Sequence, residues 1–400
     1  MVNIAVLGYG TVGSGVVEVI NTNHEIINKR AGEEINIKYV LDLRDFPGDP
    51  VQQILTHDFN DILNDDEVKV VVEVMGGINP AYTFVKQCLA AGKSVATSNK
   101  ELVASHGPEL LAIAKENNVN FLFEASVGGG IPIIRPLVSS LTADVVEEIT
   151  GILNGTTNYM LTKMSVEGSD YNEVLKDAQA KGYAEADPTA DVEGFDACRK
   201  IAILTSLVCG KTVDFEEIHT EGISKITPTD IAYAKAMGRS IKLLATSRLV
   251  NGSYYAMVAP FMLGGEHPLY NVNDVFNAIF VHGNMLGDAM FYGSGAGKLP
   301  TASAVAADIV DIVKHLNRNI MMTYSDEKLE LLDYKKAENR YFVRTTEGEA
   351  AVREIFGDIA FIRIKEATGE TAFVTEQMSE ETYLEKAEKL GGIIQMIRVG

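Results

Sequence analysis

One segment of the chain carries a high density of charged residues that could hold or move a proton. Asp196 and Lys200 stand four residues apart, so they share one face if the segment is helical. The loop before them carries Glu185, Asp187 and Asp191. A partly buried lysine beside a carboxylate can transfer a proton or bind a negatively charged oxygen. The alternative is an exposed ion pair that only stabilises the helix.

The residues around this pair have the features of a helix entered from a loop. Pro188 ends the preceding helical pattern, and Thr189 or Asp191 can cap a helix that begins near residue 192. Apolar residues then recur along one face, at Ala197, Ile201, Leu204 and Val208. This stripe predicts packing against a core, which favours a partly buried site but leaves both interpretations open.

A glycine-rich turn near the start of the chain could bind phosphate. Residues 8–13 read Gly-Tyr-Gly-Thr-Val-Gly, between a strand pattern and a helical pattern. In a dinucleotide-binding turn the first glycine permits the turn, the second lets the backbone approach the pyrophosphate, and the third lets the helix pack on the strand. The residues expected at the phosphates are Gly8, Gly10, Thr11, Val12 and Gly13. A purely structural glycine turn is the alternative.

The residues after the second strand pattern bear on which nicotinamide cofactor binds. This pattern, residues 35–41, ends in Asp42. An acidic residue here accepts hydrogen bonds from the ribose 2′-hydroxyl of NAD, whereas an arginine can bind the 2′-phosphate of NADP. Arg44 stands on the same side of the strand end. We therefore expect both NAD and NADP to bind, with a lean to NAD.

A parallel sheet must position these residues. Strand and helical patterns alternate through the first part of the chain, which predicts an α/β, Rossmann-type sheet. The strand patterns are residues 3–7, 35–41, 69–73, 94–97 and 120–124, and the helical ones include 80–91 and 108–116. The polar loops at the carboxyl ends, where ligands bind, contain Gly76, Ser98, Asn99 and Lys100. Lys100 could hold a substrate oxyanion or move its proton, or it could be an ordinary exposed lysine.

Composition excludes several classes of partner. The 400 residues carry a net charge of −20, which argues against nucleic acid and anionic membrane surfaces. The three cysteines form no CxxC pair, which argues against structural zinc and disulfides and predicts a reducing, cytoplasmic compartment. Because the first residues already form a strand pattern, we expect neither a signal peptide nor a membrane span.

The remaining chain predicts two further domains and a linker. The nucleotide domain is expected to comprise residues 1–130 plus 298–320, where a helical pattern can return to the sheet. Residues 131–297 predict an α+β substrate-binding and dimerisation domain. The linker is residues 321–338, of which the stretch 325–338 is charged and helical in pattern. Residues 339–400 predict a small βαββαβ domain.

The elements expected in these later domains follow from hydrophobic periodicity. In the middle domain they are strands 147–153, 241–249 and 254–261 and helices 156–164, 171–181 and 197–208. In the last domain they are strands 341–345, 359–365, 371–375 and 393–399 and helices 349–356 and 380–390.

Several of these motifs together resemble homoserine dehydrogenase. They are residues 8–13, 98–100, 124–132, 154–159, 182–200 and 295–305. They follow the family's order and spacing over about residues 1–320. The resemblance implies the reversible NAD(P)-dependent oxidation of L-homoserine to L-aspartate 4-semialdehyde, on the route to threonine, methionine and isoleucine.

The resemblance also implies a role for each matched residue. At the reacting oxygen of the substrate it implies Lys200, Asp196 and Lys100. At the substrate ammonium and along the pocket it implies Glu185, Asp191, Gly155 and Thr156. A hydride that leaves C4 of homoserine requires its hydroxyl proton to be accepted, and the reverse reaction requires an oxyanion to be stabilised.

Two further sites follow from the matched motifs. Gly297 is expected at the cofactor. In the family, Glu124 and the backbone carbonyls of Val127, Gly129 and Ile131 can coordinate a monovalent cation, Na⁺ or K⁺; carbonyl and carboxylate oxygens suit such a hard ion.

The tail, residues 339–400, resembles an ACT domain, a βαββαβ regulatory fold. It departs from the ACT pattern in its short first helix and in residues 346–349, which read Thr-Glu-Gly-Glu where the family has an Asp-x-Pro-Gly turn. Amino-acid binding and oligomerisation therefore both stay open for the tail. We expect a homodimer through the middle domain, or a homotetramer that also uses the tail.

Other classes of protein share parts of this pattern. Sugar and inositol dehydrogenases have a similar nucleotide fold and also place a lysine after the fourth-strand region. They pair that lysine with a different helix and usually a histidine, so the segment from Glu185 to Lys200 argues against this class. A non-catalytic dinucleotide sensor would need neither lysine. An aldehyde dehydrogenase needs a loop cysteine, whereas Cys88, Cys198 and Cys209 lie in helical patterns.

Overall fold

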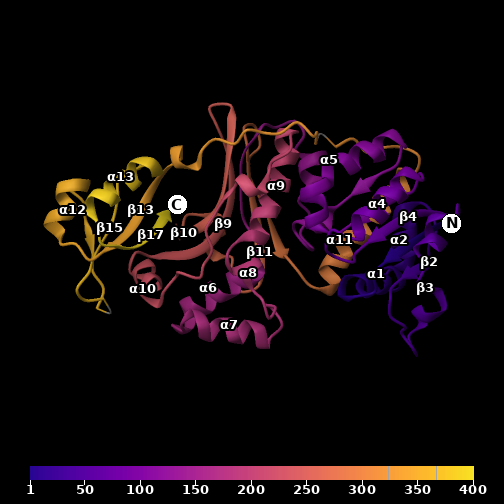
Figure 1. Cartoon of the computed structure of the whole chain (residues 1–400), viewed down its shortest axis with the longest axis horizontal. Helices are drawn as coiled ribbons and strands as arrows, with labels where there is room; N and C mark the ends of the chain where they lie inside the picture. Colours follow the sequence, from indigo (N-terminus) through magenta and orange to yellow (C-terminus); the bar gives the residue numbers. More distant parts are fainter. Residues whose placement is uncertain (323, 366) are drawn as a thin grey trace. The chain divides into compact units, whose positions relative to one another are not determined.

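The computed structural model describes residues 1–322, 324–365 and 367–400 (Figure 1). The chain separates into two compact units. Unit 1 comprises Met1–Val145, Ala202–Asp214 and Phe291–Leu329, and unit 2 comprises Val146–Ile201, Phe215–Met290 and Glu330–Gly400. The finer domain boundaries given above stay predictions.

Unit 1 contains the parallel sheet that the alternating pattern predicts. Its strand order is β3-β2-β1-β4-β5-β6, and the neighbouring strands are parallel. The strands are β1 (Val2–Leu7), β2 (Ile35–Leu41), β3 (Leu55–Thr56), β4 (Val68–Glu73), β5 (Ser94–Thr97) and β6 (Phe121–Leu122). The order reverses between β1 and β4, and in such a sheet the carboxyl ends at the reversal form the ligand crevice.

Helices cover this sheet and complete its core. They are α1 (Thr11–Thr22), α2 (His24–Ala31), α3 (Phe59–Leu63), α4 (Ala81–Ala90), α5 (Lys100–Glu116) and α11 (Lys298–Lys314). α11 comes from a late part of the chain, yet it packs beside α1 and on β4 and β5 (Figure 1). Val16 and Ile20 of α1 share one buried core with Val305 and Ile309 of α11.

Two predicted boundaries in unit 1 are wrong. α5 begins at Lys100 rather than at Pro108, and Pro108 lies in its interior. Asn99 explains the early start, because its side chain caps the helix by accepting a hydrogen bond from the Leu102 N–H (3.1 Å). The strand expected over residues 120–124 is only the two-residue β6.

Unit 2 is built on a mixed sheet. Within the described residues the sheet has 11 strands, and its main order is β12-β11-β7-β9-β10-β17-β13-β15-β14. The strands before the tail are β7 (Val146–Ile152), β8 (His219–Thr220), β9 (Arg239–Val250), β10 (Ser253–Gly264), β11 (Phe276–Gly283) and β12 (Gly287–Ser294). The helices are α6 (Gly155–Glu167), α7 (Tyr171–Ala180), α8 (Thr189–Val192), α9 (Phe195–Cys209) and α10 (Pro228–Ala236), and the later residues of α9 belong to unit 1.

The sequence patterns missed five elements here, namely β8, β11, β12, α8 and α10. β12 has no fully buried residue, so its hydrophobic pattern is weak. α10 has little amphipathic character, but its start carried a usable signal. Thr227 and Asp230 form a capping box, and Pro228 occupies the first helical position.

The tail has the predicted βαββαβ order, with one additional short strand. Its elements are β13 (Glu338–Thr345), α12 (Glu349–Phe356), β14 (Phe361–Ile362), β15 (Thr371–Val374), β16 (Met378–Ser379), α13 (Glu380–Leu390) and β17 (Ile393–Val399). Its sheet continues that of the preceding residues, because β17 pairs with β10. Arg398 on β17 is fully buried, and its guanidinium donates hydrogen bonds to Glu380 of the tail and to Glu221. Glu221 directly follows β8, the short strand that pairs with β10, so these bonds connect the tail to the sheet of the preceding residues.

The helical character predicted for the linker is wrong. Among the described residues of 321–338, the only helical turn is the short 3₁₀ segment Tyr334–Lys336. The backbone N–H groups of Leu329 and Leu332 instead donate to the carbonyls of Thr212 and Tyr254. These hydrogen bonds pair backbone N–H groups that would bond within the segment if it were a helix.

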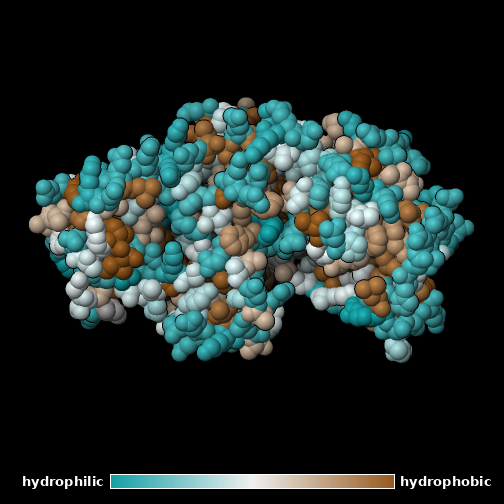
Figure 2. Space-filling view, in the orientation of Figure 1, coloured by the Kyte–Doolittle hydropathy of each residue, from teal (hydrophilic) through white to brown (hydrophobic). Residues whose placement is uncertain are grey.

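Hydrophilic side chains occupy most of the face shown in Figure 2, with hydrophobic groups scattered between them. This surface agrees with the net charge of −20. Among the described residues, no helix has the length and apolar character needed to cross a bilayer.

Candidate active site

Asp196 and Lys200 form a buried ion pair in the first part of α9. The helix begins at Phe195, so the two residues are one turn apart as predicted, and the Lys200 Nζ lies 2.8 Å from Asp196 Oδ2. Lys200 also donates to the carbonyl oxygen of Leu153 at 2.8 Å, at the end of β7. Lys200 is 9% exposed and Asp196 is 6% exposed. The pair is therefore not the exposed helix-stabilising contact that was the alternative.

Asn154, which the sequence interpretation did not single out, joins this pair to a second carboxylate. Its side-chain Nδ2 donates to Asp196 Oδ2 at 2.9 Å and to Asp191 Oδ1 at 2.8 Å. Its Oδ1 accepts from the backbone N–H of Thr157 at 2.9 Å and so caps α6. One buried amide thus orients two carboxylates and the start of a helix.

The environment of Asp191 favours its neutral form more than water would. Burial raises the pKa of the Asp191 carboxyl, and the nearby Asp196 charge raises it further. The hydrogen bond from Asn154 and the charge of Lys200 oppose this rise in pKa. Asp191 belongs to the short helix α8, which brings it beside the start of α9.

The start of α6 is held from two sides. The Thr156 hydroxyl donates to the backbone carbonyl of Tyr183 at 2.6 Å, in the loop that follows α7. A Cβ on Gly155 would lie 2.8 Å from the carbonyl oxygen of Val275, so a larger residue would force this segment away. Gly155 is thus required by close packing as well as by any pocket that it lines.

A second polar cluster braces the segment that packs against Gly155. The Asn158 amide donates to the carbonyls of Val272, Asp274 and Phe276. The Lys242 ammonium donates to the carbonyl of Val272 at 2.5 Å and to Asn273 Oδ1 at 2.9 Å. Lys242 is 1% exposed, and burial lowers its pKa to about 8.

Glu185 and Asp187 do not join the buried cluster through their side chains. Glu185 is exposed in the loop between α7 and α8, where its backbone carbonyl accepts a hydrogen bond from Gln179 at 3.0 Å. The Asp187 carboxylate instead accepts hydrogen bonds from the backbone N–H and the hydroxyl of Thr189, the first residue of α8. The role predicted for Glu185 stays a prediction.

In unit 1 the glycine turn has the geometry that its residue types predict. Gly8 has φ +97°, which only glycine adopts readily. A Cβ on Gly13 would lie 1.9 Å from the Gly8 carbonyl oxygen, whereas a Cβ on Gly10 would meet nothing within 4 Å. Thr11 and Val12 begin α1, so their N–H groups belong to the first turn, which has no partners inside the helix. The turn can therefore receive a pyrophosphate over Gly10.

A cavity of about 500 Å³ adjoins this turn and continues past Asp42 and Arg44. The Arg44 guanidinium donates to both carboxylate oxygens of Asp42, at 2.9 and 3.0 Å. This pairing lowers the pKa of Asp42, and the carboxylate also accepts from the Tyr9 N–H at 2.8 Å. The acidic and basic groups that would discriminate NAD from NADP are therefore bonded to each other.

The loops after β4 and β5 are tied together. The Asn99 side chain donates to the carbonyl of Gly77 at 2.6 Å, next to Gly76. The buried Glu73 carboxylate accepts from Thr97 at 2.6 Å, and burial raises its pKa. Three more of the predicted cofactor residues lie near these loops or before α11. The Ser98 N–H donates to the Glu73 carbonyl, and Lys100 is the partly buried first residue of α5. Gly297 directly precedes α11 and has φ +119°.

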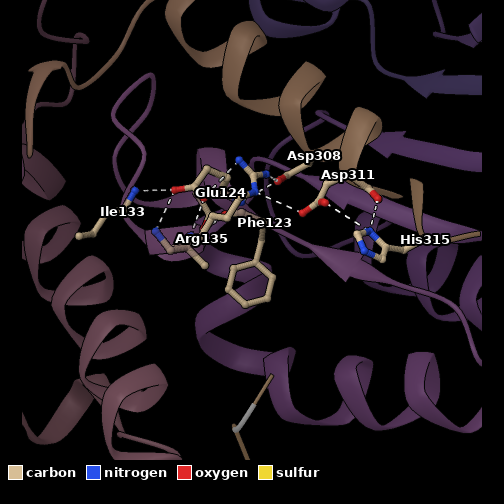
Figure 3. A network of polar contacts seen from close by, with 9 residues as sticks. Phe123, Glu124, Ile133, Arg135, Asp308, Asp311 and His315 are labelled. Atoms are coloured by element: carbon tan, nitrogen blue, oxygen red, sulfur yellow. Dashed lines mark hydrogen bonds and ion pairs between the residues drawn. The ribbon is translucent and has the colours of Figure 1, made fainter. Parts of the chain in front are cut away.

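Glu124 belongs to a buried network that reaches α11 (Figure 3). Its carboxylate accepts from the backbone N–H groups of Ile133, Ile134 and Arg135 at 2.6–2.8 Å. The Arg135 guanidinium donates to Asp308, whose carboxylate also accepts from the Glu124 N–H. Burial raises the pKa of Asp308 to about 8, although the charge of Arg135 opposes this. The network fixes both ends of residues 124–135.

The backbone oxygens predicted for a cation are not used in hydrogen bonds. Val127, Gly129 and Ile131 are buried, and no hydrogen bond from a described residue reaches their carbonyl oxygens. Buried carbonyls normally have a partner, and three for which the described part of the chain offers no donor fit a hard cation. The Glu124 carboxylate, by contrast, is already the acceptor of three backbone N–H groups.

A parallel dinucleotide-binding sheet and a buried lysine–carboxylate pair define a nicotinamide-dependent oxidoreductase. Comparison with known proteins identifies which one. The profile "Homoserine dehydrogenase, NAD binding domain" matches residues 8–124, and the profile "Homoserine dehydrogenase" matches residues 132–310.

Individual relatives extend the similarity over the whole chain. Homoserine dehydrogenase of Pseudomonas aeruginosa is 37% identical, and the alignment covers 100% of this chain and 91% of that protein. The crystal structure of a homoserine dehydrogenase from Thiobacillus denitrificans has a TM-score of 0.92 at 34% identity, covering 100% and 98% of the two chains. A hyperthermophilic archaeal homoserine dehydrogenase in complex with NADPH has a TM-score of 0.65 at 28% identity, covering 78% and 97%.

The chain belongs to the homoserine dehydrogenase family. Its reaction is the NAD(P)-dependent interconversion of L-homoserine and L-aspartate 4-semialdehyde. The sequence interpretation found this family and the Asp196–Lys200 pair, but it missed the contribution of Asn154. The available signal was an asparagine directly before a helical pattern, which predicts a cap; it does not predict what the other end of the amide contacts.

Proposed function

We propose that Lys200, Asp196 and Lys100 carry the reaction of this homoserine dehydrogenase. The observation that carries the proposal is the buried Lys200 ammonium, which uses two hydrogen bonds on Asp196 and the Leu153 carbonyl. An ammonium has three N–H donors, so one is left for the substrate oxygen. Lys100, the first residue of α5, is proposed to contact the same oxygen.

Each residue then has a separate task at the reacting oxygen. When bound, the nicotinamide exchanges a hydride with C4 of the substrate. Lys200 donates a hydrogen bond to the oxygen on C4 and stabilises the negative charge that develops on it. Asp196 holds the Lys200 ammonium in place through its hydrogen bond at 2.8 Å. Lys100 exchanges the hydroxyl proton, taking it during oxidation and returning it during reduction.

The amino-acid part of homoserine requires a second set of contacts. We propose that Asp191 and Glu185 bind its ammonium and that Gly155 and Thr156 line the pocket. Asp191 supports this proposal because it lies one amide away from Asp196. We expect Asp191→Asn to raise the homoserine KM more than it lowers kcat, since the contact exists before and during the reaction. Asp187→Asn is the matched control, and an equal rise in its KM would contradict the assignment.

For the cofactor, we propose that both NAD and NADP bind. The cofactor contacts would come from Gly8, Gly10, Thr11, Val12, Gly13, Asp42, Arg44, Gly76, Ser98, Asn99, Lys100 and Gly297. Because Arg44 neutralises Asp42, neither a 2′-hydroxyl nor a 2′-phosphate is strongly excluded. The lean to NAD is tested by initial rates at 340 nm with each cofactor, and a more than thousandfold preference for NADP would contradict it.

We also propose a monovalent cation, Na⁺ or K⁺, at the carbonyls of Val127, Gly129 and Ile131. Glu124 is proposed as the carboxylate ligand of the same site, and its hydrogen bonds from residues 133–135 hold the following segment in place. Turnover and thermal stability measured against KCl and NaCl, with choline chloride at equal ionic strength, test this proposal. Identical curves for all three salts would contradict it.

The proposed assembly is a homodimer through the middle domain or a homotetramer that adds the tail. The proposed location is the cytoplasm, which fits three cysteines without a disulfide among the described residues. Light scattering at micromolar concentration tests the assembly, and a monomer would contradict it. Whether the ACT-like tail binds an amino acid can be tested by titrating threonine, methionine and isoleucine into the assay.

A further inference from the structure

Asn154 occupies a position from which one side chain can control several parts of the proposed site. It follows Leu153, whose carbonyl accepts a hydrogen bond from Lys200, and it precedes Gly155. It is 6% exposed. Its amide uses both ends, with Nδ2 on the two carboxylates and Oδ1 on Thr157.

The two hydrogen bonds from Nδ2 separate carboxylates that would otherwise repel each other. Asp191 Oδ1 and Asp196 Oδ2 each accept one N–H of the same amide. Within unit 2, the charged groups that face Asp191 are Asp196 and Lys200. Hydrogen bonds to a carboxylate favour its charged form, and like charges disfavour it. The amide therefore offsets part of the cost of keeping both carboxylates charged in a buried place.

We propose that Asn154 is a positioning residue for the homoserine reaction, which fixes the geometry and charge of Asp191 and Asp196 together. Through Asp196 it sets the direction of the Lys200 ammonium, and through Asp191 it sets the contact to the substrate ammonium. The inference rests on the proposed function, since it assumes the roles given to Asp191, Asp196 and Lys200. It adds a residue for which the family resemblance implied no role.

A purely structural role for Asn154 makes a different prediction. As the cap of α6, it could matter only because its Oδ1 accepts from Thr157. Serine and aspartate are also good caps, but neither can donate the two N–H groups. The substitutions Asn154→Ser and Asn154→Asp therefore keep the cap and remove the donors, and the aspartate adds a third negative charge.

The experiment compares these two variants with wild type and with Asp170→Ala. Asp170 caps α7 through Glu173 and lies outside the carboxylate cluster, so it controls for the loss of a cap. Homoserine kcat and KM are measured from pH 5 to 10, and thermal unfolding is measured on the same samples. Lys200→Ala is assayed in parallel.

We expect Asn154→Ser to unfold near the wild-type temperature and to lose about 10- to 100-fold in kcat/KM, the loss typical of hydrogen bonds to a charged group. The acid limb of its kcat/KM profile should move to higher pH, because the carboxylates lose a donor that favours their charged form. Asn154→Asp should move the acid limb to still higher pH, because it also adds a third negative charge. Asp170→Ala should lower the unfolding temperature without changing kcat/KM or the limb.

A wild-type kcat/KM and an unmoved acid limb in folded Asn154→Ser would overturn the inference. If that variant does not fold, the same two readouts on Asn154→Asp decide. The parallel assay separates this result from the proposed function. If Lys200→Ala keeps more than about a tenth of wild-type turnover, the proposed function fails, whatever the Asn154 variants do.

Discussion

The glycine turn of unit 1 and the Asp196–Lys200 cluster of unit 2 are prepared for charged ligands by different means. The turn offers backbone N–H groups at the start of α1, and the space over Gly10 is open. The cluster consists of side chains that bond one another, from the buried Lys200, Asp196 and Asn154 to the partly buried Asp191. The first binds through backbone shape and the second through fixed side-chain charges.

This difference indicates which substitutions each region tolerates. A site made by the backbone depends on residues that permit a conformation or a close approach, and it is insensitive to most side-chain charges. A site made by buried charges depends on every member, because removing one partner leaves another buried and unpaired. We therefore expect the nucleotide region to lose function when a substitution changes the backbone conformation or fills the space over it. We expect the substrate region to lose function when a substitution removes or adds a charge.

The largest effect is expected from removing the charge of Lys200. Lys200→Ala should lower kcat by about a hundred- to a thousandfold, because the lost contact is strongest in the transition state. Cofactor affinity, measured by fluorescence titration with NADH, should stay near the wild-type value. Lys163→Ala, on the exposed side of α6 where Lys163 pairs with Glu167, is the control. Retention of more than about a tenth of the turnover would make Lys100 the better candidate for the central role.

The next effect concerns stability at alkaline pH in the substrate region. The folded state lowers the pKa of Lys242 from 10.5 to about 8, so above pH 8 the folded protein has lost a proton that the unfolded chain still binds. By linkage, Lys242 should raise the free energy of unfolding by about 2 kcal/mol between pH 7.5 and 9.5.

Urea unfolding of wild type and of Lys242→Met separates this contribution from that of other titrating groups. As the pH rises, the free energy of unfolding of wild type should increase relative to that of Lys242→Met. A constant difference over this range would show that Lys242 titrates as an ordinary lysine.

An effect of similar size is expected in the nucleotide region, where two glycines should behave differently. Gly13→Ala adds a Cβ 1.9 Å from the Gly8 carbonyl oxygen, so the turn must open, at about 1–3 kcal/mol of stability. Gly10→Ala meets no protein atom within 4 Å, so it should unfold like wild type and still weaken cofactor binding. Thermal unfolding and the KM for NAD check both variants. Unchanged cofactor KM values in Gly10→Ala would mean that the pyrophosphate lies elsewhere.

The smallest effect is expected at the edge of the cofactor cavity. Arg44→Ala should raise the KM for NADP by about tenfold, the value of one exposed charge-assisted contact, and should leave that for NAD nearly unchanged. The freed Asp42 carboxylate should then disfavour a 2′-phosphate. Steady-state rates with both cofactors provide the measurement, and equal losses would show that Arg44 does not contact the phosphate.

Local patterns were sufficient to predict the features that depend on local spacing. The turn at residues 8–13 follows from three glycines between a strand and a helix, and the Asp196–Lys200 contact follows from the four-residue spacing. The alternation of strand and helical patterns predicted the parallel sheet, but not the order of its strands. Each of these depends on residues close together in the chain.

The features that the sequence did not predict depend on contacts between distant segments. Asn154 meets Asp191 and Asp196 only after β7, α8 and α9 have been brought together. Residues 325–338 of the linker were predicted to be helical, but the backbone N–H groups of Leu329 and Leu332 bond other segments. The pairing of β17 with β10 could not be read from either strand alone. For Pro108, the cap at Asn99 outweighed the usual preference for proline at a helix start.

The most direct test of the charged cluster is a double-mutant cycle on Asp196 and Lys200, with homoserine kcat as the readout. If the two residues act as one unit, Asp196→Ala combined with Lys200→Ala should cost little more than the worse single variant. Losses that multiply, so that the double variant falls by the product of the two single effects, would contradict the account and show that the two residues act independently.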